Sequence, residues 1–79
     1  MIKLNLYYTS HCHLCDLAES ILASLSSEHD ISWILIEIVD SDELLAKYST
    51  RIPVIERLDN QTEIQWPFTT PELIQFLVI

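Results

Sequence analysis

The sequence Cys12-His13-Leu14-Cys15 stands where a hydrophobic segment, Leu4 to Tyr8, gives way to a segment with helical periodicity. Apolar residues recur from Leu14 to Leu25 at the i, i+3, i+4 and i+7 spacing of a helix with one buried face. The two patterns predict a strand, a loop and a helix, with the cysteines at the start of the helix. Such a unit would present a reactive cysteine, so the pair points first to redox chemistry.

The next apolar segment predicts a second strand beside the first. Residues 31–39 are almost continuously apolar and rich in isoleucine, which favours a strand buried on both faces, as in a parallel sheet covered by helices. Strand, helix and strand then form a βαβ unit with a right-handed crossover. A short second helix should follow an N-cap at Asp40 or Ser41 and end before Pro53.

The rest of the chain predicts a hairpin and a last helix. Residues 54–58 and 62–66 flank the turn-forming Asp59-Asn60-Gln61, as in an antiparallel hairpin. Thr-Thr-Pro-Glu at 69–72 is a helix start signal. The chain has no glycine, so we expect a positive φ to fall on Asn60. The predicted order is βαβαββα, in one domain over residues 1–79.

Charge and hydropathy indicate which kinds of partner and which cellular location to expect. Twelve acidic residues against four basic ones give a formal net charge of −8. Nucleic acids and anionic lipids are bound through clusters of Lys and Arg, so we expect neither partner. The sequence has no signal-peptide pattern, and no apolar run approaches the roughly 20 residues of a membrane span. We expect a cytoplasmic monomer, where a C-x-x-C pair is more often catalytic or metal-binding than structural.

Three motifs occur in a characteristic order: Cys12-His13-Leu14-Cys15, Arg51-Ile52-Pro53-Val54 and Trp66-Pro67-Phe68. With the βαβαββα order they resemble the thioredoxin fold in its smallest, glutaredoxin-like form. More narrowly, they are similar to a family of short bacterial glutaredoxin-like proteins, over essentially the whole chain. The resemblance implies an α/β fold with a four-stranded mixed sheet flanked by helices. It also implies a thiol-disulfide oxidoreductase that serves cell redox homeostasis.

The spacing of the cysteines suggests unequal roles. Thiol-disulfide exchange needs a thiolate that attacks and a second thiol that resolves the mixed disulfide. Cys12 lies at the positive end of the predicted helix dipole, which favours a thiolate, so we assign it as the nucleophile. Cys15 lies beside the apolar stripe and should be the more buried, resolving thiol. His11 and His13 can supply positive charge or a proton beside the substrate.

The other two motifs provide candidate substrate-binding residues. The resemblance implies a cis Ile52-Pro53 bond facing the cysteines, with the Ile52 backbone available to pair with an extended substrate. Trp66 and Phe68 either form an aromatic wall for an apolar part of a protein substrate or pack in the core. Arg51 is the basic residue nearest to this site in the sequence.

Two departures from glutaredoxins disfavour glutathione as the co-substrate, although they leave it open. Thr9 occupies the place of a lysine that precedes the first cysteine, and Trp66-Pro67-Phe68 stands where a Gly-Gly pair would be. Arg51 alone is left to meet the two carboxylates of glutathione. We therefore expect protein disulfides or mixed disulfides as substrates, a thiol as reductant, and neither a cofactor nor a metal site.

Two other functions remain open. The C-x-x-C pair could bind a metal or a shared iron-sulfur cluster, although structural zinc usually needs four converging ligands. Alternatively, the domain could be a non-catalytic interaction module, because fold does not imply activity. The sequence does not reveal the natural substrate, the reductant or the reduction potential.

Overall fold

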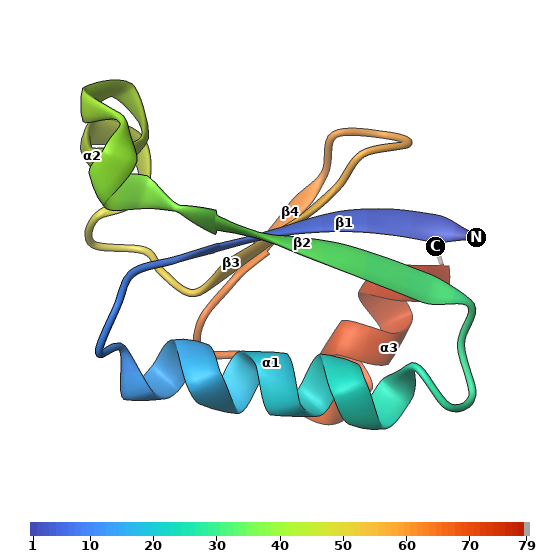
Figure 1. Cartoon of the computed structure of the whole chain (residues 1–79). Helices are drawn as coiled ribbons and strands as arrows, with labels where there is room; N and C mark the ends of the chain where they lie inside the picture. Colours follow the sequence, from blue (N-terminus) through green and yellow to red (C-terminus); the bar gives the residue numbers. More distant parts are fainter. Residues whose placement is uncertain (79) are drawn as a thin grey trace.

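A computed structural model describes residues 1–78 and contains a four-stranded mixed sheet with three α-helices (Figure 1). The predicted fold class is therefore confirmed. The elements are β1 (Ile2–Tyr8), α1 (His13–Leu25), β2 (Ile31–Glu37), the 3-10 turn η1 (Ile38–Asp40), α2 (Asp42–Tyr48), β3 (Val54–Arg57), β4 (Glu63–Gln65) and α3 (Thr70–Val78). None of the helices within this described part has the length and apolar character needed to cross a membrane.

Strand β1 is central in the sheet, whose order is β2-β1-β3-β4. It pairs in parallel with β2, where Leu6 lies opposite Leu35, and antiparallel with β3, where Leu6 lies opposite Ile55. The end of β1 that leads to the cysteines therefore lies between the end of β2 and the start of β3. This register brings three loops to one end of the molecule.

The main core lies between the sheet and the two helices α1 and α3, which Figure 1 shows on the same side of the sheet. Side chains alternate along a strand, so every second residue of β1 points to this side. Leu4 and Leu6 are accordingly almost fully buried. The helices contribute Ala18, Leu22, Leu25, Leu73 and Leu77, which follow the helical spacing seen in the sequence.

A smaller cluster holds α2 against the opposite face, at one end of the sheet. It contains Tyr7, Ile38, Tyr48 and Val54. The rings of Tyr7 and Tyr48 stack, with their centroids 4.2 Å apart. Because α2 has only seven residues, it covers this face only beside the ends of β1 and β2 that lead to the loops.

The expectation that the second strand is buried on both faces is wrong. Strand β2 is parallel to β1, but it forms an edge of the sheet. Ile34 is 63% exposed and Leu35 is 43% exposed. A continuous apolar run indicates a strand but does not say whether a second strand or helix covers it.

The helix starts agree with the sequence, but the hairpin turn does not. Ser41 caps α2, and Thr69 and Glu72 form a reciprocal capping box before α3. The positive φ of the turn falls on Gln61, at 59°, and not on Asn60. Asn60 instead accepts hydrogen bonds from the backbone N–H and hydroxyl of Thr62, so the left-handed position moves to the next residue.

Arg57 is the one buried charged residue in the described part of the chain, with 6% of its surface exposed. It donates to the carbonyl groups of Phe76 and Leu77 at the end of α3, at 2.9 and 3.2 Å. It also pairs with both carboxylate oxygens of Asp59, and this hydrogen bonding lowers the pKa of Asp59. Arg57 thereby supplies the positive charge that α3 lacks in its own last turn.

We expect Arg57→Met to lower the free energy of unfolding by about 2 to 3 kcal/mol, because two carbonyl groups at a helix end lose a charged donor. Urea denaturation monitored by circular dichroism measures this. Asp59→Asn is the matched control and should cost less, because Asp59 is largely exposed and Arg57 keeps its carbonyl acceptors. Equal costs for the two variants would contradict the role assigned to Arg57.

Candidate active site

Cys12 and Cys15 form a disulfide at the start of α1, with their Cα atoms 5.2 Å apart. Cys12 is the N-cap of the helix, and its Sγ atom accepts a hydrogen bond from the Cys15 backbone N–H at 3.1 Å. A helix start has free N–H groups and a positive dipole end, both of which stabilise a thiolate on the N-cap residue. The geometry therefore favours Cys12 as the more acidic thiol of the reduced pair.

The two cysteines differ in exposure, as the sequence predicted. Cys15 is buried, with 3% of its surface exposed, whereas Cys12 is partly exposed. Solvent can therefore reach Cys12, while Cys15 is covered by the protein. This asymmetry agrees with an attacking and a resolving role, which remain predictions.

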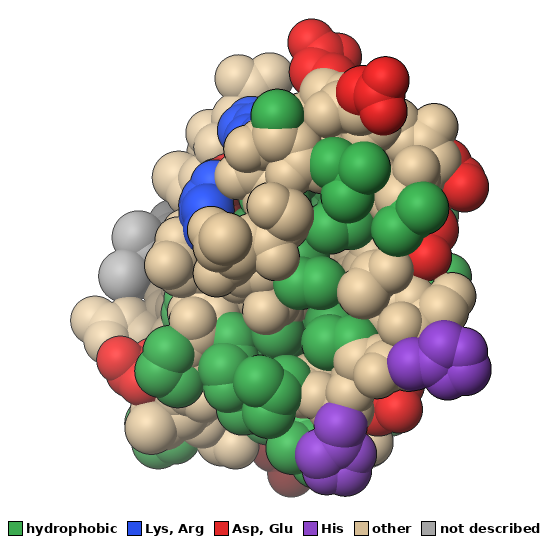
Figure 2. All heavy atoms as spheres, turned by 90° about the vertical axis from the view of Figure 1, so that its left-hand side faces the viewer, with side chains coloured by type: hydrophobic (Ala, Val, Ile, Leu, Met, Phe, Trp, Pro, Cys, Tyr) green, Lys and Arg blue, Asp and Glu red, His purple; other side chains and the backbone are tan. Residues whose placement is uncertain are grey.

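His11 and His13 both lie exposed beside the disulfide. His11 has a positive φ of 63°, which turns the chain from the loop after β1 toward the helix. Figure 2 faces this end of the molecule and shows histidine side chains at the rim of a band of hydrophobic side chains. Both histidines are thus accessible to solvent, and their contact with a substrate stays a prediction.

The loop before Cys12 is held by a carboxylate that sequence analysis did not single out. Glu37, at the end of β2, accepts hydrogen bonds from the Thr9 hydroxyl at 3.2 Å and from the Ser10 N–H at 3.2 Å. The Ser10 hydroxyl donates to the same oxygen at 3.3 Å. The sequence offered one signal, since Glu37 is the single charged residue within the apolar segment 31–39.

The Ile52-Pro53 bond is cis, as the family resemblance implied. Val54 pairs with Tyr7, which brings Pro53 to the end of β1 from which the cysteine loop departs. The Ile52 N–H already donates to the Tyr48 carbonyl at 3.1 Å, so the expectation of a free Ile52 backbone is wrong for this group. Its carbonyl accepts no backbone hydrogen bond within residues 1–78 and can still pair with a substrate.

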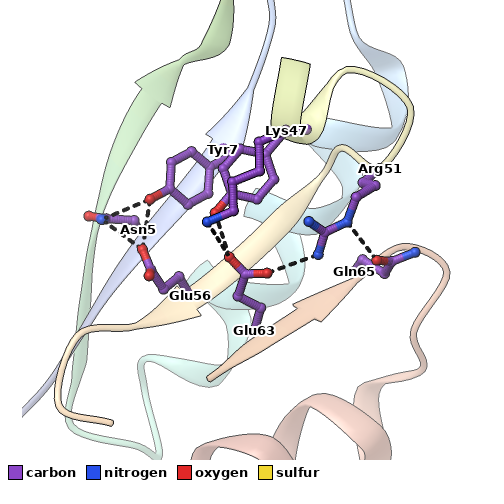
Figure 3. A network of polar contacts seen from close by, with 8 residues as sticks. Asn5, Tyr7, Lys47, Arg51, Glu56, Glu63 and Gln65 are labelled. Atoms are coloured by element: carbon purple, nitrogen blue, oxygen red, sulfur yellow. Dashed lines mark hydrogen bonds and ion pairs between the residues drawn. The ribbon is translucent and has the colours of Figure 1, made fainter. Parts of the chain in front are cut away.

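Arg51 is bound internally (Figure 3). Its guanidinium donates to Gln65 at 2.8 Å and to Glu63 at 2.9 Å. Glu63 also accepts the hydroxyl hydrogen of Tyr48 and lies 4.0 Å from Lys47. This network ties α2 and the loop before Pro53 to β4, and its pairing leaves Arg51 less able to bind an anionic ligand.

Glu63 holds its charge although it is partly buried. Burial raises the pKa of a carboxyl group, but the hydrogen bonds from Tyr48 and Arg51 and the charges of Arg51 and Lys47 outweigh it. The net effect lowers the Glu63 pKa below its ordinary value of 4.5. Burial, followed by the hydrogen bond to Glu63, raises the pKa of Tyr48, so this phenol stays protonated.

The two aromatic candidates occupy different environments. Phe68 is 6% exposed and belongs to the main core, which agrees with the core-packing interpretation. Trp66 is half-buried, touches Phe68 edge to face, and lines a groove of about 340 Å³ with Leu17 and Ile21 of α1. Of the two, Trp66 lines this groove and Phe68 does not.

Within residues 1–78, no three His, Cys, Asp or Glu side chains are grouped so that they could hold a metal ion.

Comparisons with known proteins agree with this geometry. Residues 3–78 match the model of the glutaredoxin-like domain family (DUF836). No curated protein sequence matches the chain. The X-ray structure of protein XcR50 from X. campestris is 33% identical, covers 95% of each chain and superposes with a TM-score of 0.83.

Two structures with lower sequence identity share the fold. The solution structure of protein Ne2328 from Nitrosomonas europaea is 23% identical, covers 96% of this chain and 91% of its own, and has a TM-score of 0.85. Thioredoxin 1 from Thermosipho africanus is 18% identical, covers 92% of this chain and 86% of its own, and has a TM-score of 0.69. At these identities the likeness concerns the fold alone.

We expect Glu63→Gln to reduce the unfolding free energy by about 1 kcal/mol at pH 7, because charge-assisted hydrogen bonds are exchanged for weaker ones. The folded pKa of Glu63 lies below 4.5, so its ionisation stabilises the fold above that pH. This stability is lost as the pH falls through the folded pKa. The difference between wild type and variant should therefore stay constant above about pH 5 and shrink below it.

Urea unfolding at a series of pH values tests this expectation. Glu28→Gln, at an exposed glutamate in the loop after α1, is the control and should leave the curve unchanged. A difference between Glu63→Gln and wild type that persists unchanged at pH 3 would show that the Glu63 charge does not stabilise the fold.

Proposed function

The chain belongs to the glutaredoxin-like domain family, and we propose that it is a thiol-disulfide oxidoreductase that reduces protein disulfides or mixed disulfides. The observation that carries the proposal is the Cys12-Cys15 disulfide at the N-terminus of α1, with one sulfur accessible and the other buried. A reversible disulfide needs this combination of an accessible nucleophile and a nearby second thiol.

The proposed reaction moves two electrons in two exchange steps. The Cys12 thiolate attacks one sulfur of the substrate disulfide, forms a mixed disulfide and releases the other substrate sulfur as a thiolate. The Cys15 thiol then loses its proton and attacks the Cys12 sulfur. This step forms the Cys12-Cys15 disulfide and releases the second substrate thiolate. An external thiol reductant returns both cysteines to thiols and is itself oxidised.

Several features of the site support a protein substrate over glutathione. Arg51 is engaged by Glu63 and Gln65. The N–H groups of Thr69 and Glu72 at the start of α3 are bound within the capping box, so they are not free for a carboxylate. The overall charge of −8 disfavours glutathione, a peptide with two carboxylates, one ammonium group and a net negative charge. Trp66 and the hydrophobic band of Figure 2 suit an apolar protein surface.

The same proposal includes the setting in which the protein works. We propose a cytoplasmic monomer, in a compartment where thiols are kept reduced and the pair can cycle. The excess of acidic residues supports a protein that binds neither nucleic acid nor anionic membranes.

We expect Cys12→Ser to reduce the rate of insulin-disulfide reduction to background, because the attacking thiolate is lost. Cys15→Ser should instead accumulate a mixed disulfide between Cys12 and the substrate, visible by non-reducing mass spectrometry. Zinc and iron analysis of the same wild-type preparation distinguishes redox catalysis from metal binding. Full activity of Cys12→Ser would refute the assigned nucleophile, and an inactive wild type that carries stoichiometric metal would refute the proposed function.

A further inference from the structure

We propose that Glu37 is a positioning residue that holds the loop before Cys12 and thereby sets the acidity of the Cys12 thiol. The inference deepens the proposed function, because it concerns the same nucleophile. It starts from two observations: one carboxylate oxygen of Glu37 is shared by three loop donors, and the other is buried without a hydrogen-bond partner among the described residues.

The first observation shows what Glu37 holds. Its Oε1 atom accepts from both side chains and one backbone N–H of Thr9-Ser10, the residues that join β1 to His11. Glu37 itself is fixed, since it ends β2 opposite Tyr8, the last residue of β1. One acceptor on a paired strand therefore determines where the loop leaves the sheet.

The second observation argues against a merely incidental contact. A buried polar atom without a partner costs stability, and most such atoms in native proteins are satisfied. A leucine or valine would fill a strand end in this apolar segment without leaving such an oxygen unpaired. A buried carboxylate at this place therefore calls for an explanation, and the loop that its other oxygen holds beside the cysteines provides one.

The position of the loop matters because the loop leads directly into the start of α1. His11 adopts a left-handed backbone, and Cys12 then caps α1 with its sulfur at the Cys15 N–H. In the reduced protein the same N–H and the helix dipole favour the Cys12 thiolate. A loop that is free to shift would move this sulfur away from the helix axis, and the thiol would become less acidic.

Glu37 affects the pKa of the Cys12 thiol in two opposite ways, and variants can separate them. The hydrogen bonds from the loop to Glu37, here called the tether, lower this pKa, and the negative charge of Glu37 raises it. A nearby negative charge disfavours a thiolate, whereas the tether favours it through geometry. Glu37→Gln removes the charge but keeps a side chain of nearly the same shape with one acceptor oxygen. Glu37→Leu removes both. Comparison of these two variants with each other isolates the tether.

The experiment measures the rate at which iodoacetamide alkylates Cys12 between pH 5 and 10, in the full chain with Cys15→Ser so that one thiol reacts. We expect Glu37→Gln to have a Cys12 pKa at or below that of the parent. Glu37→Leu should have a higher pKa than Glu37→Gln and react about two- to fivefold more slowly at pH 7, the size of a helix N-terminal interaction. Identical profiles for the two variants would overturn the proposal.

Two further variants keep the test decisive. Glu56→Leu alters another half-buried strand glutamate, which binds Tyr7 and not the loop, and it should leave the alkylation profile unchanged. If Glu37→Leu does not fold, Thr9→Val with Ser10→Ala removes two of the three donors and should slow alkylation in the same direction. An unchanged profile there would also overturn the proposal. Because alkylation needs no substrate protein, the result is independent of whether insulin is reduced.

Discussion

The pairing of β1 with a parallel strand on one side and an antiparallel strand on the other is the constraint that places the site. It brings the last residues of β1 and β2 and the first residues of β3 to the same end of the sheet. The cysteine loop, Glu37 and the Ile52-Pro53 segment leave the sheet there. Burial of Leu4 and Leu6 beneath α1 fixes this register, since a shift by one residue would turn both side chains away from the core.

The site itself combines two kinds of support. On the helix side, the N-terminus of α1 provides an N–H group to Cys12 and buries Cys15. On the strand side, Glu37 holds the loop before Cys12, and Glu63 joins Tyr48 and Arg51 beside Pro53. The Cys12 sulfur thus lies between a helix start and a hydrogen-bonded loop, and histidines and hydrophobic side chains are exposed at this end of the molecule.

Sequence periodicity was sufficient for the element order, the helix caps and the unequal exposure of the two cysteines, because these depend on local patterns. It did not show that β2 is an edge strand, because the apolar segment 31–39 does not reveal what lies beside it. Nor did it show the partners of Arg51 or the role of Glu37. Those contacts join residues 12 to 28 positions apart, and only the folded sheet brings them together.

The proposed function requires that Cys12 and Cys15 form a reversible two-electron couple. A redox titration in thiol-disulfide buffers, read by alkylation and mass spectrometry, measures this property without a substrate protein. We predict a single two-electron transition within the range of thioredoxins and glutaredoxins, about −270 to −200 mV. A pair that stays wholly oxidised or wholly reduced across that range would contradict the claim that Cys12 and Cys15 form a reversible couple.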